Sequence, residues 1–258
     1  MNTIHPSAVI HPNAKIGEDV TIGPNAVIDE HVTIGDRCQI WANAYITGHT
    51  TMGPDNLVHM GAVIGHWPQH TAYDPSTPAY VEIGAGNTFR EQCIIHASFA
   101  EGQKTTIGDK CFFMHQSHVA HDCHIGNRVT IASCSLAAGH VTVEDGAFIS
   151  GLVAIHQFSR IGSLAMVGGV SRVNRDVPPY MMLVGDSEVV GLNVVGLKRS
   201  GLSPDVRKKI RRAYKTLYHS GLTTPQAIER LQAEADCDEV RHIADFIANS
   251  QRGICGHK

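Results

Sequence analysis

The feature that most constrains this chain is a mainly aliphatic position that recurs every six residues. It runs without a miss from Ile4 to Ile64, returns at Ile83, and after a second break continues from Ile107 to Val173. A helix has a period of 3.6 residues and a plain strand a period of 2, so neither explains a period of six. Hexapeptide repetition is typical of a parallel β-helix.

Three hexapeptides close one coil of a triangular prism, with one short strand on each side. Residues 18 positions apart then lie one above the other, at roughly the 4.8 Å spacing of paired strands. The length of the repeat predicts between eight and nine coils. We therefore predict a mainly β protein in which residues 1–185 form the β-helix.

Two segments interrupt the repeat, at about residues 65–80 and 97–106. The first contains Pro68, Pro75 and Pro78, and both are predicted to be loops that leave the prism. Loops on a rigid scaffold often carry binding residues, although others only decorate it.

The pattern changes near the end of the chain, where Pro178-Pro179 is expected to end the prism. Ser203-Pro204-Asp205 is a typical helix start, with a capping serine and a proline in the first turn. Thr224-Pro225 predicts a second helix, and the apolar residues around Phe246 predict a third. Residues 186–258 are predicted to form a small helical domain.

Composition argues against several classes of protein. The net charge is −3 and the pI is near 6.6, which does not favour nucleic-acid binding. No stretch of eighteen apolar residues and no basic, apolar N-terminus is present, so we expect neither an integral membrane segment nor a secretory signal. The seven cysteines form no CxxC pair and are expected to be reduced. Together these features predict a cytoplasmic protein.

Basic residues are concentrated between positions 198 and 215, where Asp205 is the single acid. A solvated helix face would usually mix both signs, so this stretch favours a docking surface for an acidic partner. The basic residues are Lys198, Arg199, Arg207, Lys208, Lys209, Arg211, Arg212 and Lys215.

Histidines gather on one edge of the predicted prism. The 18-residue spacing places Gly139 and Gln157 in the column of His121, and places His140 in the column of Asp122. His156 falls in the neighbouring column of the same edge. None of these histidines occupies an aliphatic or inward position, so they are expected to face outward, on a surface that a second subunit could cover.

Three chemistries fit this cluster, and the spacing leaves all three open. His121 followed by Asp122 supplies a general base and an acid that orients it. Gly139, one coil further along, could present its backbone N–H to a developing oxyanion. Alternatively, three histidines from adjacent subunits could bind zinc, or the cluster could be surface without chemistry.

Over nearly its whole length the chain resembles the bacterial acyl-[acyl-carrier-protein]–UDP-N-acetylglucosamine O-acyltransferases. Members of this family catalyse the first step of lipid A synthesis. The segments that carry the resemblance are His118-Val119-Ala120-His121-Asp122-Cys123, Ala138-Gly139-His140-Val141, Ala154-Ile155-His156-Gln157-Phe158, Met166-Val167-Gly168-Gly169, Asp176-Val177-Pro178-Pro179-Tyr180 and Gly196-Leu197-Lys198-Arg199.

The resemblance implies a left-handed β-helix, a homotrimer with active sites between subunits, acyl carrier protein as donor substrate, a sugar nucleotide as acceptor, and neither cofactor nor metal. In this reading His121 is the general base, Asp122 orients it, and the Gly139 N–H stabilises the oxyanion.

Other positions are carried over residue by residue. The substrate-binding residues would be Gln69, His70, His96, His118, His140, His156, Gln157, Asn193 and Arg199. The acyl-chain groove would contain Met114, Met166 and Gly169. The surface that docks acyl carrier protein would contain Arg207, Lys208, Lys209, Arg211 and Arg212.

Four positions depart from the family pattern. His70 and Ala72 replace an acid and a lysine, and Val195 and Ser200 replace a glutamate and an arginine. The departures leave open a paralogue that acylates a different sugar nucleotide, including one with an amine in place of the hydroxyl. A trimeric zinc lyase of the carbonic anhydrase type, and a binding protein that has lost its acceptor site, are the remaining alternatives.

Overall fold

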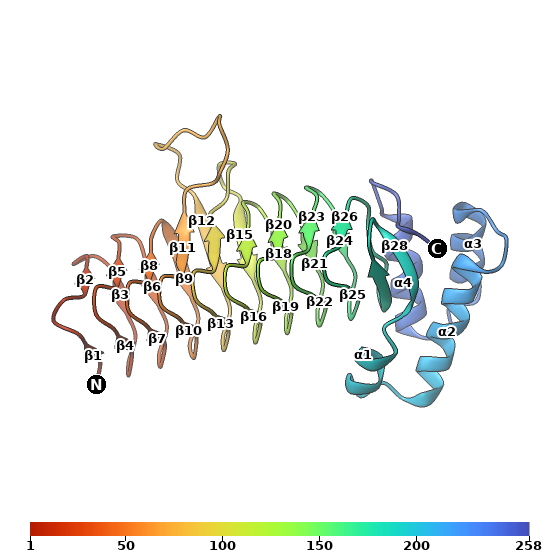
Figure 1. The fold of residues 1–258 in the computed structure, drawn as a ribbon, viewed down its shortest axis with the longest axis horizontal. Helices are drawn as coiled ribbons and strands as arrows, with labels where there is room; N and C mark the ends of the chain where they lie inside the picture. The colour runs from red at the N-terminus through yellow and green to blue at the C-terminus, as the bar shows by residue number, and fades with distance from the viewer. Residues whose placement is uncertain (258) are drawn as a thin grey trace.

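The computed structural model of the chain describes residues 1–257. Its strands stack into three sheets that form the sides of a prism, and helices lie at one end of it (Figure 1). The register pairs Thr3 with Thr21 and Thr130 with Phe148, so each coil of the uninterrupted repeat contains 18 residues. The predicted β-helix with three hexapeptides per coil is confirmed.

The three faces divide the strands as follows. The first face contains β1 (Thr3–Ile4), β4 (Thr21–Ile22), β7 (Gln39–Ile40), β10 (Leu57–Val58), β13 (Thr88–Phe89), β16 (Phe112–Phe113), β19 (Thr130–Ile131), β22 (Phe148–Ile149), β25 (Met166–Val167), β27 (Met181–Val184), β28 (Glu188–Leu192) and β29 (Gly256–His257). The second contains β2 (Val9–Ile10), β5 (Val27–Ile28), β8 (Tyr45–Ile46), β11 (Val63–His66), β14 (Ile94–His96), β17 (His118–Val119), β20 (Leu136–Ala137), β23 (Ala154–Ile155) and β26 (Arg172–Val173). The third contains β3 (Lys15–Ile16), β6 (Thr33–Ile34), β9 (His49–Met52), β12 (Tyr80–Ile83), β15 (Lys104–Ile107), β18 (His124–Ile125), β21 (Thr142–Val143) and β24 (Arg160–Ile161).

The aliphatic position of the hexapeptide points into the prism. Ile22, Ile40 and Ile64 are fully buried, and Phe89 stacks on Phe113 with ring centroids 5.0 Å apart. Burying one such side chain contributes roughly 1.5–3 kcal/mol. Repetition of this contribution along the axis holds the coils in register.

Left-handed backbone turns the chain at the corners of the prism. Asn25, Asn43 and Asp122 have φ angles of 55°, 57° and 57°. Asparagine and aspartate tolerate this region better than other residues with a Cβ.

Both loops leave the prism at the corner between the second and third faces. The first lies between β11 and β12, and the second between β14 and β15 (Figure 1). The predicted end of the second loop at residue 106 was wrong, because Lys104 and Thr105 already pair with Tyr80 and Val81 in the third sheet.

The end of the chain contains more β-structure than the hexapeptide pattern indicates. β27 pairs in parallel with β25 beyond Pro179, so this proline pair does not end the first sheet. β28 then pairs antiparallel with β27, in a hairpin through Gly185, and β29 adds to β28. These strands have no six-residue period, which is why the repeat does not predict them.

In the described part of the chain, four helices accompany these strands: α1 (Val194–Arg199), α2 (Pro204–Tyr218), α3 (Thr224–Ala233) and α4 (Asp238–Ala248). The three predicted helices are confirmed as α2, α3 and α4, and Ser203 caps α2 by accepting from the Val206 amide. The short helix α1 was not predicted. Within residues 1–257, none of the helices has both the length and the apolar character needed to cross a membrane.

Helix α4 is attached to the prism by polar and aromatic contacts. His242 Nε2 lies 2.7 Å from the Glu144 carboxylate, and the Arg160 guanidinium lies 4.0 Å from the centre of the Phe246 ring. Arg160 also donates to the Phe246 carbonyl at 3.0 Å. These contacts fix the helices on the last coils of the prism.

Candidate active site

His121 lies at the corner between β17 and β18. The left-handed backbone of Asp122 turns the chain there. His121 Nδ1 lies 2.8 Å from Asp122 Oδ2, and the two side chains are only 12% and 5% exposed. A carboxylate on Nδ1 fixes the imidazole and leaves Nε2 for a substrate.

Asp122 is itself held in place by the second loop and by β15. The Phe99 amide donates to both carboxylate oxygens, at 3.1 and 3.2 Å, and the Asp122 amide donates to Thr105 Oγ1 at 2.9 Å. Burial raises the pKa of the Asp122 carboxyl, but the hydrogen bonds from His121 and from the Phe99 amide outweigh it and the pKa lies below its usual value. Asp122 is therefore a carboxylate at neutral pH. No repeat or motif in the sequence marks Phe99 or Thr105 as part of this site.

Gly139 lies against the His121 ring, one coil further along the prism. A Cβ built on Gly139 would fall 2.6 Å from His121 Cε1. Within residues 1–257 the Gly139 N–H donates to no backbone carbonyl, whereas its carbonyl accepts from the Phe158 amide at 3.1 Å. A free N–H next to a base is the arrangement that stabilises an oxyanion.

His140 completes the immediate surroundings of Asp122. Its ring is perpendicular to that of His121, at 5.2 Å between centroids, and its Nε2 lies 3.8 Å from Asp122 Oδ2. The opposite side of the ring stacks on Phe158 at 4.7 Å. The pKa of His140 lies below its usual value, mainly because the ring is partly buried, so the ring is neutral near pH 7.

The first loop brings His70 to the same place. Its ring packs on Phe99 at 4.0 Å between centroids and approaches the His121 ring edge-on at 5.7 Å. The Ala72 amide donates to His70 Nδ1 at 3.2 Å, so the neutral ring carries its proton on Nε2. Gln69 is exposed beside it on the loop.

His96 on β14 and His118 on β17 form a pair in which His96 is buried and His118 is half-buried. His96 Nδ1 lies 2.8 Å from His118 Nε2, so one imidazole donates to the other. Burial, and then the neighbouring His118, lower the pKa of His96 to about 4. Burial also lowers the pKa of His118. The pair is therefore uncharged near neutral pH.

His156 and Gln157 lie along this corner two coils beyond His121, and both remain exposed. His156 Nδ1 lies 3.0 Å from the carbonyl oxygen of Gln157, a local contact. Within residues 1–257 no ring contact joins His156 to His121 or His140, although the register of β20, β23 and β26 keeps it on the same edge. Its place in the histidine cluster stays a prediction.

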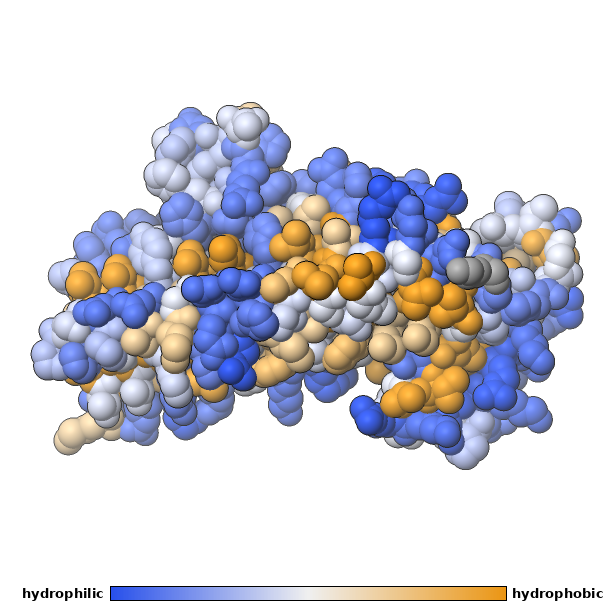
Figure 2. All heavy atoms as spheres, in the orientation of Figure 1, coloured by the Kyte–Doolittle hydropathy of each residue, from blue (hydrophilic) through white to orange (hydrophobic). Residues whose placement is uncertain are grey.

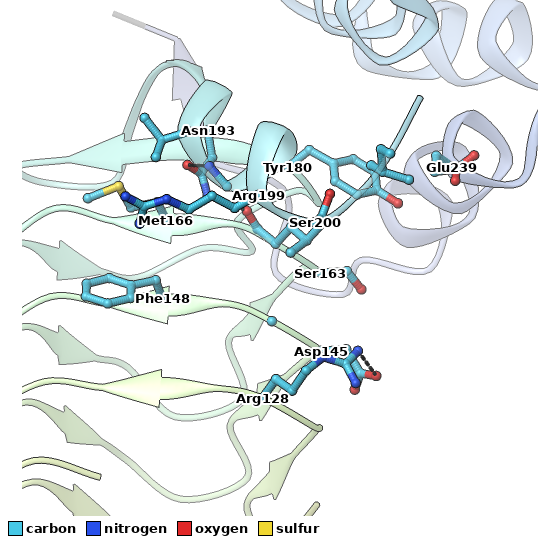
Figure 3. A pocket seen from close by; sticks show the side chains of 15 residues that line it. Arg128, Asp145, Phe148, Ser163, Met166, Tyr180, Asn193, Arg199, Ser200 and Glu239 are labelled. Carbon is cyan, nitrogen blue, oxygen red and sulfur yellow. Dashed lines mark hydrogen bonds and ion pairs between the residues drawn. The ribbon is translucent and has the colours of Figure 1, made fainter. Parts of the chain in front are cut away.

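A separate cleft of about 860 Å³ lies beneath α1. Figure 3 shows Phe148 and Met166 projecting from neighbouring strands on the side where Asn193 and Arg199 lie. The Asn193 side chain caps α1 by accepting from the Gly196 amide at 2.9 Å, and it donates to the Leu164 carbonyl at 2.8 Å. None of the predicted catalytic residues lines this cleft.

The cleft also contains residues that the sequence analysis did not select. They are Arg128, Asp145, Gly146, Phe148, Ser163, Leu164, Tyr180, Gly196, Leu202 and Glu239, together with the departing residues Val195 and Ser200. Those between Arg128 and Leu164 hold ordinary positions in the hexapeptides, and the others lie beyond the end of the repeat at Val173. The repeat therefore marks none of them as part of a cleft.

The three residues predicted for the acyl-chain groove lie on different parts of the prism. Met166 lines the cleft from β25, whereas Met114 and Gly169 follow strands of the first face at its corner with the second. A Cβ at Gly169 would lie 3.4 Å from the Gly151 carbonyl oxygen, so little else fills the space beside it.

The basic stretch divides into two groups on α2. Arg207, Lys208 and Arg211 line a pocket of about 300 Å³ with Lys198 and several apolar residues. Lys209 instead lies 3.4 Å from Asp236, and Arg212 lies 3.6 Å from the same carboxylate. The first group is therefore better placed to meet a partner than the second.

Comparison with known proteins agrees with these observations. The model of a family described as UDP N-acetylglucosamine O-acyltransferase, domain 2, matches residues 176–255, and the model of the bacterial transferase hexapeptide matches residues 104–139. A third family model, described as the GMPPB C-terminal domain, matches residues 1–72 of this chain. An acyl-[acyl-carrier-protein]–UDP-N-acetylglucosamine O-acyltransferase of Halorhodospira halophila is 44% identical over 98% of this chain and 99% of its own length.

The chain belongs to the acyl-[acyl-carrier-protein]–UDP-N-acetylglucosamine O-acyltransferase family. A member from Burkholderia orbicola is 47% identical over 98% of this chain and 99% of its own. The solved UDP-N-acetylglucosamine acyltransferase of Francisella novicida superposes with a TM-score of 0.95, at 35% identity over 98% of this chain and 94% of its own. The solved UDP-N-acetylglucosamine acyltransferase of Campylobacter jejuni superposes with a TM-score of 0.94, at 34% identity over 99% of this chain and 100% of its own.

Membership of this acyltransferase family confirms the predicted resemblance and the predicted fold class, a left-handed parallel β-helix with C-terminal helices. The protein is an enzyme, an acyltransferase. The family assignment also decides against the alternative class of zinc lyases.

Proposed function

We propose that this protein transfers an acyl chain from acyl carrier protein to the 3-hydroxyl of UDP-N-acetylglucosamine, the first step of lipid A synthesis. Family membership supports the reaction and both substrates. The single observation that carries the mechanism is the contact of His121 with Asp122 and Gly139 in one partly buried corner.

The reaction begins with proton transfer. His121 Nε2 accepts the proton of the sugar 3-hydroxyl as its oxygen attacks the carbonyl carbon of the thioester. Asp122, whose carboxylate holds Nδ1–H, stabilises the imidazolium that forms. The Gly139 N–H donates to the tetrahedral oxyanion. Collapse of this intermediate breaks the carbon–sulfur bond, and His121 returns the proton to the departing thiolate of the carrier.

The remaining predicted contacts fit a site completed by a second subunit. His121 lies at the corner between the second and third faces, whereas Asn193, Arg199 and Met166 line the cleft beneath α1. In a homotrimer, the cleft of one subunit would meet the His121 corner of its neighbour. Large apolar side chains exposed on the prism, including Trp41, Leu136 and Leu152, support burial against another subunit. Figure 2 shows apolar residues exposed along the prism as far as its helical end.

The acyl carrier protein would dock on Arg207, Lys208 and Arg211, with Lys209 and Arg212 adding to the positive field. Met114, Met166 and Gly169 would face the acyl chain. His96, His118 and His156, with Gln69 and Gln157, would border the substrate.

The test compares His121→Ala with His124→Ala, a histidine three positions away that is bonded to Thr106 at 2.9 Å outside this corner. Loss of the base should lower acyl transfer by about 10²–10⁴-fold, and the control should keep the normal rate. Assays with UDP-N-acetylglucosamine and its 3-amino analogue identify the acceptor. A His121→Ala variant of normal activity would remove the assignment of the base.

A further inference from the structure

The His121 corner brings together three groups that can each bind a metal ion. One nitrogen of His121, one nitrogen of His140 and one carboxylate oxygen of Asp122 lie within 4.8 Å of one another. Within residues 1–257, no other set of three histidine, cysteine or acidic side chains brings its ligand atoms this close. Although the chain contains 17 histidines, such a set of ligand atoms is found at this corner and nowhere else in residues 1–257.

The chemistry of these groups is that of a zinc site. Two imidazoles and one carboxylate are a ligand set that zinc takes when its fourth position holds water. Zinc–ligand bonds of about 2.0–2.2 Å place tetrahedral ligand atoms roughly 3.3 Å apart. The set would have to contract by roughly 1.5 Å at its widest. His140 can supply this movement because its side chain is 37% exposed, whereas Asp122 is held.

The surroundings of the carboxylate also favour a bound ion. The two hydrogen bonds from the Phe99 amide orient Asp122 without using all of its lone pairs. Partners of this kind fix ligating carboxylates in metal sites.

We propose that His121, Asp122 and His140 form an inhibitory site for a divalent transition-metal ion such as Zn²⁺. The ion would bind His121 Nδ1, the nitrogen that faces Asp122. The neutral ring would then carry its proton on Nε2 and could not accept the proton of the substrate, so metal binding and acyl transfer exclude each other. This inhibition rests on the proposed function, whereas the binding of the ion does not. The ion takes no part in the transfer reaction.

The experiment measures binding and activity separately. Protein freed of metal with EDTA, and then of EDTA itself, is dialysed against a series of ZnCl₂ concentrations from below to above one equivalent per chain, and bound zinc is measured by atomic absorption. His140→Asn removes one ligand in a residue type that suits the φ of 60° at this position, and Asp122→Asn removes another. His156→Asn, at the exposed neighbouring position, is the matched control.

We expect one zinc ion per chain in the wild type and in His156→Asn. Each of the other two variants should bind zinc at least 10-fold more weakly, with circular dichroism unchanged. Zinc should abolish acyl transfer of the wild type with the same midpoint as binding, and EDTA should restore it.

Wild-type affinity in both His140→Asn and Asp122→Asn would overturn the site, as would the absence of stoichiometric binding. Full zinc occupancy with undiminished acyl transfer would overturn the inhibition. An enzyme without acyl transfer even in EDTA would contradict the proposed function instead, and the dialysis would still decide whether the metal site exists.

Discussion

The imidazole of His121 rests on the backbone of Gly139, so closely that a Cβ at position 139 would fall 2.6 Å from its Cε1 and 2.8 Å from its Nε2. Any side chain at position 139 would therefore push the His121 ring out of its place. The contact joins the proposed base to the proposed oxyanion donor, because one residue supplies both the space for the ring and the free N–H.

Gly139→Ala should therefore displace the imidazole and lower kcat by about 10²–10³-fold, the usual cost of losing an oxyanion donor. Steady-state kinetics with an acyl-carrier thioester measure the change. Gly191→Ala is the matched control, since nothing lies within 4 Å of a Cβ at that position. Equal rates for the two variants would show that Gly139 has no catalytic contact.

The sequence predicted this contact because of the repeat. Once the coil is known to contain 18 residues, His121 must lie beside Gly139, and Asp122 beside His140. The hexapeptide period thus predicted both the prism and the centre of the candidate site from arithmetic alone.

The surroundings of that centre could not be predicted in the same way. Phe99 reaches Asp122 from a loop without a period, and its contribution is a backbone amide, which leaves no signature in a sequence. Asn193 and Arg199 were selected by resemblance, but the strands β27–β29 that position α1 follow no hexapeptide. The column position of His156 was correct, whereas the direction of its side chain depends on local rotamers that spacing does not determine.

Asp122→Asn should keep the shape of the corner and remove the charge that stabilises the imidazolium. By comparison with the same change in a Ser-His-Asp triad, we expect kcat to fall by about 10²–10⁴-fold. Phe99 can still donate to the amide oxygen, so thermal unfolding should change little. A variant that unfolds at the normal temperature and keeps the normal rate would contradict the role of Asp122.

His70 should contribute to binding of the acceptor, because the loop holds its ring edge-on to that of His121 while Phe99 supports it. His70→Ala should raise KM for the sugar nucleotide by roughly 10-fold, equivalent to one hydrogen bond, and should change kcat less. Ser76→Ala, exposed on the same loop, serves as the control. An unchanged KM for both UDP-N-acetylglucosamine and its 3-amino analogue would exclude this role.

The contact between His242 and Glu144 should make stability depend on pH. The hydrogen bond to Glu144 raises the pKa of His242, so its stabilisation is complete below the unfolded value of about 6.5 and is lost as pH rises through the folded value. Burial raises the pKa of Glu144 but the bond to His242 outweighs it, so this stabilisation is present above about 4.5 and is lost as pH falls through the lowered value.

Both contributions are therefore present between about pH 4.5 and 6.5. His242→Ala should lower Tm by about 2 °C near pH 6, and by less at pH 8.5, where the wild type has lost the charge. The small size reflects solvent screening, since the His242 side chain is 36% exposed. Scanning calorimetry at the two pH values measures the difference, and a larger effect at pH 8.5 would reverse the assignment.

Carrier docking should depend on the three cations of α2 that line this pocket together with Lys198. Reversing Arg207, Lys208 and Arg211 to glutamate should lower kcat/KM for the acyl-carrier thioester by about 10–100-fold, and should weaken its dependence on salt. Lys209→Gln and Arg212→Gln should have smaller effects, because these cations already face Asp236. A short acyl-pantetheine donor, which lacks the acidic protein surface, should react at the same rate with every variant. If the triple variant lost activity equally with both donors, the basic residues would support the fold or the active site, and the docking surface would have to lie elsewhere.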